Sequence, residues 1–283
     1  GMDAEIGPGV FRNHLPFENP DSINEIACEM TVEEAVTDSA AGSRSGGIIL
    51  GYFYNINSSG GATGDIFAYL MIGKIKGGSD LEAYWAVLQV MSDDTANKNL
   101  LGSGTIDGFD PAVMNPPYDT KIVYDSDRTF QFSVGTHTHT YIGPERKRGP
   151  VTKLKSLSTG IDAVSGANNG YVSAKFDNVV INSAPSVYDD FSESRIDLSK
   201  WWYSEWIREE KNGYLRAEIP GYDVTRTVNT HLEEKDAPYV EAKVLIDSST
   251  ELSYGANCVA RIQGYYYNES RGPGSGQRYN RYE

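Results

Sequence analysis

Short stretches of alternating apolar and polar residues run through most of the chain and predict β-strands. Residues 47–55 are an apolar and aromatic run, typical of a strand covered on both faces, and residues 170–182 follow an Asn-Asn-Gly turn. Residues 66–75 and 82–91 form a predicted hairpin, and helix-like patterns are confined to stretches such as 198–208. Many short strands without βαβ alternation predict an all-β fold, an antiparallel β-sandwich or jelly roll.

The stretch from residue 170 to residue 182, GYVSAKFDNVVIN, has the pattern of a strand that closes a domain. A Ser-Ala-Pro-Ser break follows it, and a new stretch opens at Tyr188. The chain is therefore predicted to hold a first β-module over residues 1–185 and the opening half of a second over residues 186–283. As an alternative, residues 188–215 fold back beside the closing strand and complete the first module.

Two pairs of matching segments recur at one spacing. MDAEI begins at Met2 and LRAEI at Leu215, while GYFYN begins at Gly51 and GYYYN at Gly264, so both pairs are 213 residues apart (215 − 2, 264 − 51). The shared offset predicts an internal repeat with a partial second copy, as in a stretch of a longer tandem array. Because incomplete modules leave unpaired edges, we expect a homodimer through exchange or pairing of these modules.

Composition narrows the classes of partner. The chain has 283 residues and a formal net charge of −14, which excludes a nucleic-acid backbone as partner because such binding needs clustered cations. The basic run over residues 145–155 is short and broken by Gly-Pro, as in a solvated turn. No window is apolar enough for membrane insertion. The two cysteines, Cys28 and Cys258, are expected to be unpaired buried thiols.

Two stretches resemble the concanavalin A-like lectin/glucanase superfamily, in particular its LamG-like jelly-roll modules. Residues 188–201, YDDFSESRIDLSKW, resemble the "DDF…ID…KW" opening of secreted members, and residues 170–182 resemble their last strand. Residues 129–142 are a looser match to a long strand pair of these proteins. The resemblance implies a concanavalin A-like jelly roll and an extracellular or cell-surface location. It does not settle function, because lectins, glycosidases and non-catalytic modules share these motifs.

Catalytic members of this superfamily carry an E-x-D-x-x-E strand motif, whose carboxylates share one face and serve as nucleophile and acid/base. Residues 25–29, EIACE, have Ala27 where that motif needs a carboxylate, and residues 205–210, EWIREE, have the wrong intervening residues. The motif is thus missing. We therefore expect a non-catalytic carbohydrate-binding or cell-surface module. The alternatives are a glycoside hydrolase or lyase with unplaced carboxylates, and a structural spacer.

Aromatic and histidine side chains supply the candidate glycan contacts, because the resemblance implies that sugars bind the concave sheet face. Phe53 alternates with the tyrosines on either side of it and is expected to point away from both. The candidates are Tyr52, Tyr54, Trp85, His137 and His139. The two histidines share one strand face and could also bind a transition metal, although no third ligand is evident; polar residues on a strand face are the other interpretation.

Two aspartates are candidate metal ligands. The resemblance implies a structural Ca²⁺ near the junction of the first and last strands, with Asp177 as a ligand and Asp189 as its neighbour. The alternative is that Asp177 accepts a hydrogen bond from the neighbouring backbone.

Overall fold

The computed structural model describes most of the chain up to residue 202 and shorter stretches beyond it. The described residues are 2–6, 9–39, 42–93, 95, 97–163, 170–193, 196–197, 199–202, 207–211, 214–218, 241–245, 260, 262–268 and 277–282. Contacts divide the chain into two units, residues 1–228 and residues 229–283. None of the described helical residues forms a segment that is both long and apolar enough to cross a membrane.

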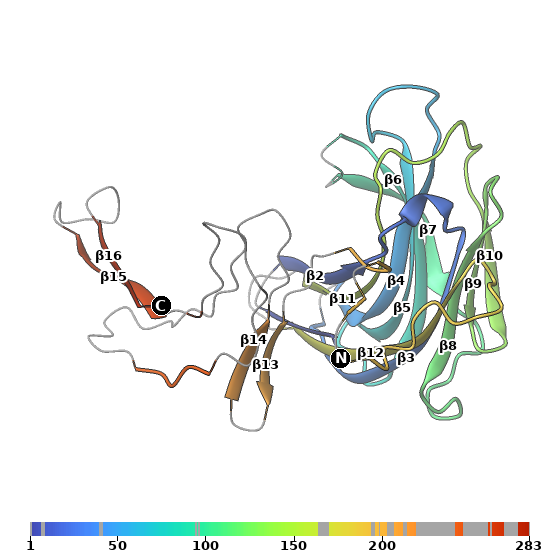
Figure 1. The fold of residues 1–283 in the computed structure, drawn as a ribbon. Helices are drawn as coiled ribbons and strands as arrows, with labels where there is room; N and C mark the ends of the chain where they lie inside the picture. The colour runs from blue at the N-terminus through green and yellow to red at the C-terminus, as the bar shows by residue number, and fades with distance from the viewer. Residues whose placement is uncertain are drawn as a thin grey trace. The chain divides into compact units, whose positions relative to one another are not determined.

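The first unit contains two six-stranded antiparallel sheets that face each other (Figure 1). Sheet A has the order β1 (Met2–Ile6), β12 (Gly170–Ile181), β3 (Glu25–Val36), β8 (Tyr118–Tyr124), β9 (Thr129–Val134) and β10 (His137–Ile142). Sheet B has the order β2 (Gly9–Pro16), β11 (Lys155–Ala163), β4 (Arg44–Asn55), β5 (Asp65–Ile75), β6 (Glu82–Val90) and β7 (Lys98–Thr105). The predicted antiparallel β-sandwich of jelly-roll type is confirmed.

The hydrophobic core lies between the two sheets and is built from alternate residues of each strand. Its largest fully buried side chains include Phe130 and Phe132 from sheet A and Ile49, Ile66 and Leu70 from sheet B. Burying such side chains contributes about 1.5–3 kcal/mol each. Strand β4 is buried on both of its faces, as its continuous apolar run predicts.

A β-bulge in β4 changes the expected directions of its aromatic residues. Tyr52 pairs with Phe67, but Tyr54 pairs with Ile66, so Phe53 is the extra residue between them. As a result Phe53 and Tyr54 both lie in the core cluster between the sheets, whereas Tyr52 lies in a separate cluster. The expectation that Phe53 points away from both tyrosines is therefore wrong for Tyr54, because alternation is broken at the bulge.

Part of the segment after β12 packs against the sandwich, and we call its described residues, 188–193, 196–197 and 199–202, the clasp. Its residue Asp189 bridges Val179 of β12, and Trp201 bridges Phe17, which follows β2. The indole of Trp201 is fully buried in the core cluster. The clasp therefore belongs to the first unit, although the predicted module boundary lies before it, at residue 185. The division into a complete and a partial module stays a prediction.

Among the residues that the structure describes, four strands follow the clasp. Strands β13 (Ile207–Lys211) and β14 (Tyr214–Glu218) form one hairpin, and β15 (Ile262–Asn268) and β16 (Gln277–Tyr282) form another in the second unit. Residues 207–208, where the sequence has a helix-like pattern, are thus in a strand.

The second unit reproduces a detail of the first. Strand β15 has a register shift between Tyr265 and Tyr267, which are 213 residues beyond Tyr52 and Tyr54. The β-bulge thus recurs at the spacing of the two matching sequence pairs. The repeat itself stays a prediction, and the shared bulge supports it.

Candidate functional site

Four aromatic rings lie in line on the outer face of sheet B, the face turned away from sheet A. We call Tyr52, Phe67, Tyr69 and Tyr84 the aromatic row. Successive ring centroids are 4.9 Å apart from Tyr52 to Phe67, 6.0 Å from Phe67 to Tyr69 and 6.1 Å from Tyr69 to Tyr84. Alternation along β5 places Ile66, Ala68 and Leu70 in the core and so turns Phe67 and Tyr69 outward. The row therefore crosses strands β4, β5 and β6.

Aliphatic side chains surround the row on the same face. Ile48, Leu50, Met71 and Ala86 form a buried cluster with Tyr69, and Phe67, Tyr84 and Leu88 pack against it. The outer face of sheet B is thus apolar, whereas the outward face of an antiparallel sheet is commonly polar. Apolar surfaces rimmed by polar residues are typical of binding sites.

Two cations flank the aromatic row. The guanidinium carbon of Arg44 lies 4.6 Å from the ring centroid of Tyr84, and its Nη1 donates a hydrogen bond to the hydroxyl of Tyr69. At the other end, Nζ of Lys98 lies 5.4 Å from the ring centroid of Phe67 and 5.9 Å from that of Tyr52. Burial raises the pKa of Tyr52, so its hydroxyl stays protonated and able to donate. The row combines ring faces, hydroxyl groups and positive charge in a chain of net negative charge.

Two of the predicted contact residues, Trp85 and His139, come together away from this row. Trp85 points between the sheets, where its ring stacks on His139 at 4.2 Å and 18° and on Phe132 at 5.3 Å. Tyr141 lies 5.5 Å away on the same strand as His139. Trp85 is only 5% exposed, and its indole N–H has no acceptor among the described residues. These side chains fill the flank of the sandwich between β6 and β10.

The other predicted residues are dispersed. Tyr54 is fully buried, stacks on Tyr124 at 5.2 Å and donates its hydroxyl to the carbonyl oxygen of Pro144 at 2.9 Å, so it offers no surface to a ligand. The ring of His137 fills the space that a side chain at Gly108 would need. The described residues contain no group of three or more His, Cys, Asp and Glu side chains able to hold a metal ion.

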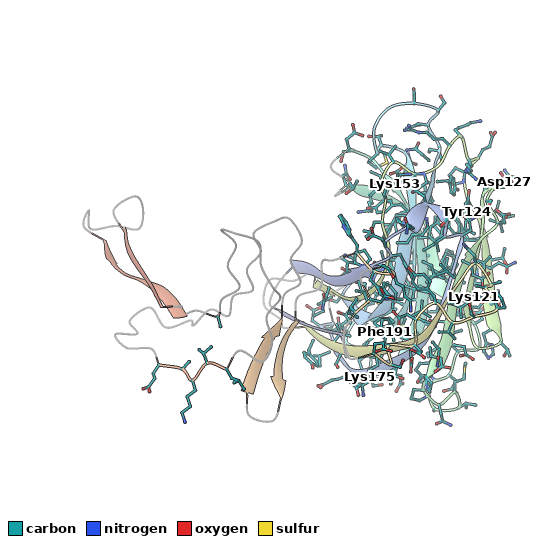
Figure 2. All side chains as sticks on the ribbon, viewed as in Figure 1. Lys121, Tyr124, Asp127, Lys153, Lys175 and Phe191 are labelled. Carbon is teal, nitrogen blue, oxygen red and sulfur yellow. The ribbon has the colours of Figure 1, made fainter. Side chains whose placement is uncertain are left out.

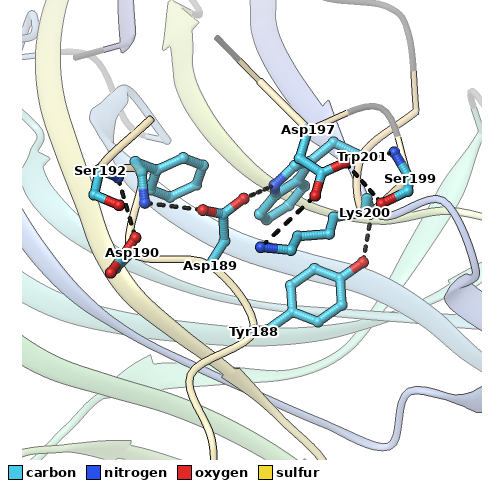
Figure 3. Close-up of polar contacts among 9 residues, drawn as sticks. Tyr188, Asp189, Asp190, Ser192, Asp197, Ser199, Lys200 and Trp201 are labelled. Atoms are coloured by element: carbon cyan, nitrogen blue, oxygen red, sulfur yellow. Dashed lines mark hydrogen bonds and ion pairs between the residues drawn. The ribbon is translucent and has the colours of Figure 1, made fainter. Parts of the chain in front are cut away.

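The two candidate calcium ligands make hydrogen bonds with protein donors. Asp177, on β12, accepts one from the backbone N–H of Asn178 at 2.8 Å. Asp189 is nearly buried, and its two carboxylate oxygens accept from Nε1 of Trp201 at 2.6 Å and from the N–H of Phe191 at 2.9 Å. The carboxylate of Asp189 thus holds the clasp together (Figure 3).

The outer face of sheet A carries a shallow depression of about 310 Å³. Glu29 and Asp177 are cross-strand partners within it, and Asp190 also lines it. Lys175 and Phe191, labelled in Figure 2, complete this part of the lining. Side chains of directly opposite residues in an antiparallel pair lie about 4.5–5.5 Å apart at Cβ. Three carboxylates, those of Glu29, Asp177 and Asp190, therefore line one cavity here, and the first two lie on strands whose sequence shows no catalytic motif.

Comparison with known proteins gives similarities at the level of fold. No protein-family profile and no curated sequence matches the chain. Among solved structures, a tetrameric galectin from the ball sponge Cinachyrella sp. is 12% identical, with a TM-score of 0.33, over 61% of this chain and 99% of that one. The PL7 alginate lyase AlyA1 from Zobellia galactanivorans is 15% identical, with a TM-score of 0.29, over 58% of this chain and 64% of that one.

A legume lectin-like domain from Entamoeba histolytica is 11% identical, with a TM-score of 0.28, over 64% of this chain and 90% of that one. All three have the concanavalin A-like jelly-roll fold, the fold that the sequence resemblance implies for this chain.

Sequence reasoning missed most of the aromatic row. Phe67, Tyr69 and Tyr84 were not among the candidates, nor were Arg44 and Lys98. A signal for them was present, because Phe67 and Tyr69 are two residues apart on one strand of the predicted hairpin and Tyr84 lies on the other. Only the register, in which Met71 opposes Tyr84 and Ala86 opposes Tyr69, brings the rings together.

Proposed function

We propose that this protein is a non-catalytic carbohydrate-binding module that binds a glycan along the aromatic row of sheet B. The observation that carries the proposal is the line of four rings, with Arg44 and Lys98 at its ends. A pyranose ring presents C–H groups on its faces and hydroxyls on its rim. Aromatic faces pack against the former, and tyrosine hydroxyls and cationic N–H groups bind the latter.

The four rings of the row differ in exposure, and we assign them different roles accordingly. Phe67 and Tyr84 are half-buried and offer ring surface, while Tyr52 and Tyr69 are nearly buried and hold the neighbouring rings in place. Rings fixed in this way lose little side-chain entropy when a ligand binds. None of the six side chains of the row and its ends is itself a carboxylate; Asp65 on β5 and Glu82 on β6 are the nearest acidic residues by strand alternation.

The proposal also covers where the protein is located and whether it holds a structural ion. We place the module outside the cell or at the cell surface, and we propose Ca²⁺ as a structural ion beside Asp177 and Asp189, where the clasp meets β12. Support for the ion comes from the position of Asp177, whose exposed carboxylate retains acceptor capacity next to the backbone bridge between Val179 and Asp189.

A second candidate function, a glycoside hydrolase or lyase, would use the other face. Glu29 and Asp177 are cross-strand partners that line one depression, and retaining glycosidases need carboxyl groups about 5–5.5 Å apart. The aromatic row favours the binding module over this alternative, because it combines ring faces with tyrosine hydroxyls and cationic groups.

A glycan array tests both candidates when it is run with and without EDTA. The binding module should retain one or more glycans without releasing new reducing or unsaturated ends. Release of such ends that Glu29→Gln abolishes would favour the enzyme instead. No binding to any glycan by folded protein would contradict the proposal, and binding lost only with EDTA would assign a role to the ion.

A further inference from the structure

The clasp holds its own shape through contacts among its own residues (Figure 3). The carboxylate of Asp189 accepts from Nε1 of Trp201 at 2.6 Å and from the N–H of Phe191 at 2.9 Å. The hydroxyl of Tyr188 donates to the carbonyl oxygen of Lys200 at 2.5 Å. Rings of Phe191 and Trp201 stack at 5.5 Å. The two ends of the clasp are therefore tied together without help from the sandwich.

The clasp makes a small set of backbone hydrogen bonds to the sandwich. On one side, the N–H of Val179 donates to the carbonyl oxygen of Asp189 at 2.8 Å, and the N–H of Tyr188 donates to the carbonyl oxygen of Val179 at 2.6 Å. On the other side, Glu18 donates to the carbonyl oxygen of Lys200 at 2.9 Å. We call these sandwich residues and their neighbours, Pro16–Glu18 and Val179, the receptor surface.

Two aromatic side chains of the clasp, Tyr188 and Trp201, pack against Phe17 of the receptor surface. The indole of Trp201 stacks on the ring of Phe17 at 4.6 Å and 30°, and Tyr188 packs against the same ring at 5.6 Å. Trp202 donates its N–H to the carbonyl oxygen of Pro16 at 2.8 Å, which completes the contact. Because Trp201 has no exposed surface, a sandwich without a clasp would open its core to water beside Phe17.

The loop that joins β12 to the clasp is short and strained. Residues 182–187 are largely exposed. Asn182 and Ser183 have φ angles of 53° and 50°, in the left-handed region that non-glycine residues rarely occupy. Strained short hinges favour exchange of the segment that follows them, because the loop relaxes when it extends to a neighbouring molecule.

We propose that the clasp exchanges between two copies of this chain, so that each clasp docks on the receptor surface of the other copy and forms a closed homodimer. Every docking contact of the clasp is kept in the exchanged form. The hinge extends when Asn182 gives up its side-chain hydrogen bonds to Ser22, Asn24 and Glu25, and Ser183 its hydrogen bond to Glu25. The arrangement is two-fold symmetric, since each copy supplies one clasp and one receptor surface. The inference is independent of what the aromatic row binds.

Mixed disulfide formation tests the exchange directly. One copy carries Glu18→Cys and the other Lys200→Cys, both with Cys258→Ser, and the two are refolded together and oxidised. Cys28 is not expected to form a disulfide in the folded protein, because it is buried and burial raises the pKa of its thiol to about 12. A chain carrying both Glu18→Cys and Lys200→Cys is the control for geometry, because the backbones of these residues are hydrogen-bonded.

Exchange predicts a disulfide-linked pair of chains in the mixed sample, seen on a non-reducing gel and lost on reduction. The proposal is overturned if the control chain forms its disulfide within a monomer while the mixed sample gives no linked pair.

A hinge variant supplies a second measurement. Six Gly and Ser residues inserted after Pro185 would let each clasp reach its own receptor surface without strain, so light scattering should show at least a tenfold fall in the dimer fraction. Asn182→Gly with Ser183→Gly relieves the same strain at constant length and should lower the dimer fraction less. A dimer fraction unchanged by both variants would contradict the role of the hinge.

Discussion

Sheets A and B have the same number of strands, but their outer faces carry different kinds of side chain. Sheet A exposes charged and hydroxyl side chains, among them Thr31, Glu33 and Lys175, with an ion pair between the last two. Sheet B presents Ile48 and Leu50, exposed by only 3% and 2%, beside the aromatic row. An antiparallel sheet needs one apolar face to form the core, and the core here lies between the sheets. A second apolar face on sheet B is therefore not required by the fold.

The difference supports the proposal that a ligand binds the outer face of sheet B. The outer face of sheet A is solvated, whereas on sheet B the aliphatic residues are buried and the partly exposed apolar surface belongs to Phe67, Tyr84 and Leu88. Arg44 and Lys98 also lie over rings on sheet B, where cation–π attraction holds them beside the partly exposed ring surface.

The largest expected effect comes from a carboxylate placed on each face. Ile48→Asp would bury an unpaired charge on sheet B and should lower the free energy of unfolding by at least about 3 kcal/mol. Thr31→Asp on sheet A, beside Lys175, should change it by less than about 0.5 kcal/mol. Urea unfolding monitored by circular dichroism measures both. Equal costs for the two variants would remove the contrast between the faces.

The next effect concerns a buried cation on the inner side of sheet B. Lys155 donates from Nζ to the carbonyl oxygen of Pro20 at 2.7 Å, and burial lowers its pKa to about 8. Because the folded protein disfavours protonated Lys155, it is destabilised below pH 8, and this cost disappears between pH 8 and the ordinary pKa of about 10.4. Lys155→Met should therefore be more stable than the wild type by roughly 1–3 kcal/mol at pH 7.

The advantage of Lys155→Met should shrink as the pH rises from 7 to 10. Chemical unfolding of both proteins at several pH values measures it, and Lys153→Met, which removes an exposed lysine paired with Asp21, is the matched control. A stability difference that stays constant with pH would contradict the assignment of the cost to the charge of Lys155.

The smallest effect is expected from the ion pair of sheet A. The ammonium of Lys175 lies against Glu33 and lowers the pKa of that carboxyl, but both side chains are more than two-fifths exposed. Lys175→Met should thus change the unfolding free energy by less than about 1 kcal/mol, and only above the pKa of Glu33, since acid removes the pair. A larger loss that persists at pH 3 would assign Lys175 a packing role instead.

Local patterns predicted the fold better than they predicted the site. Alternation and turn residues place strands in most of the chain, and the apolar run of β4 predicts its burial on both faces. The direction of Tyr54 was wrong because one extra residue, Phe53, shifts the pairing with β5. No pattern within a single strand carries that information.

The assembly of the aromatic row and the stacking of Trp85 on His139 were not predicted, for a related reason. Tyr52, Phe67 and Tyr84 come from three strands, and the hairpin register decides whether their rings meet. Trp85 and His139 lie 54 residues apart and stack because the two sheets close on each other there. Such contacts depend on tertiary packing, which single-strand alternation does not encode.

The central claim, that glycan binds the outer face of sheet B, is tested most directly by calorimetric titration of matched variants. The titrant is the best-bound glycan of the array, and the variants are Phe67→Ala with Tyr84→Ala on sheet B, and Thr31→Ala with Lys175→Ala on sheet A. Each lost ring contact is worth about 0.5–1.5 kcal/mol beyond its area, so the first pair should weaken binding at least tenfold. The second pair should leave the affinity unchanged. Tight binding by the sheet B variant, or binding lost only in the sheet A variant, would contradict the claim.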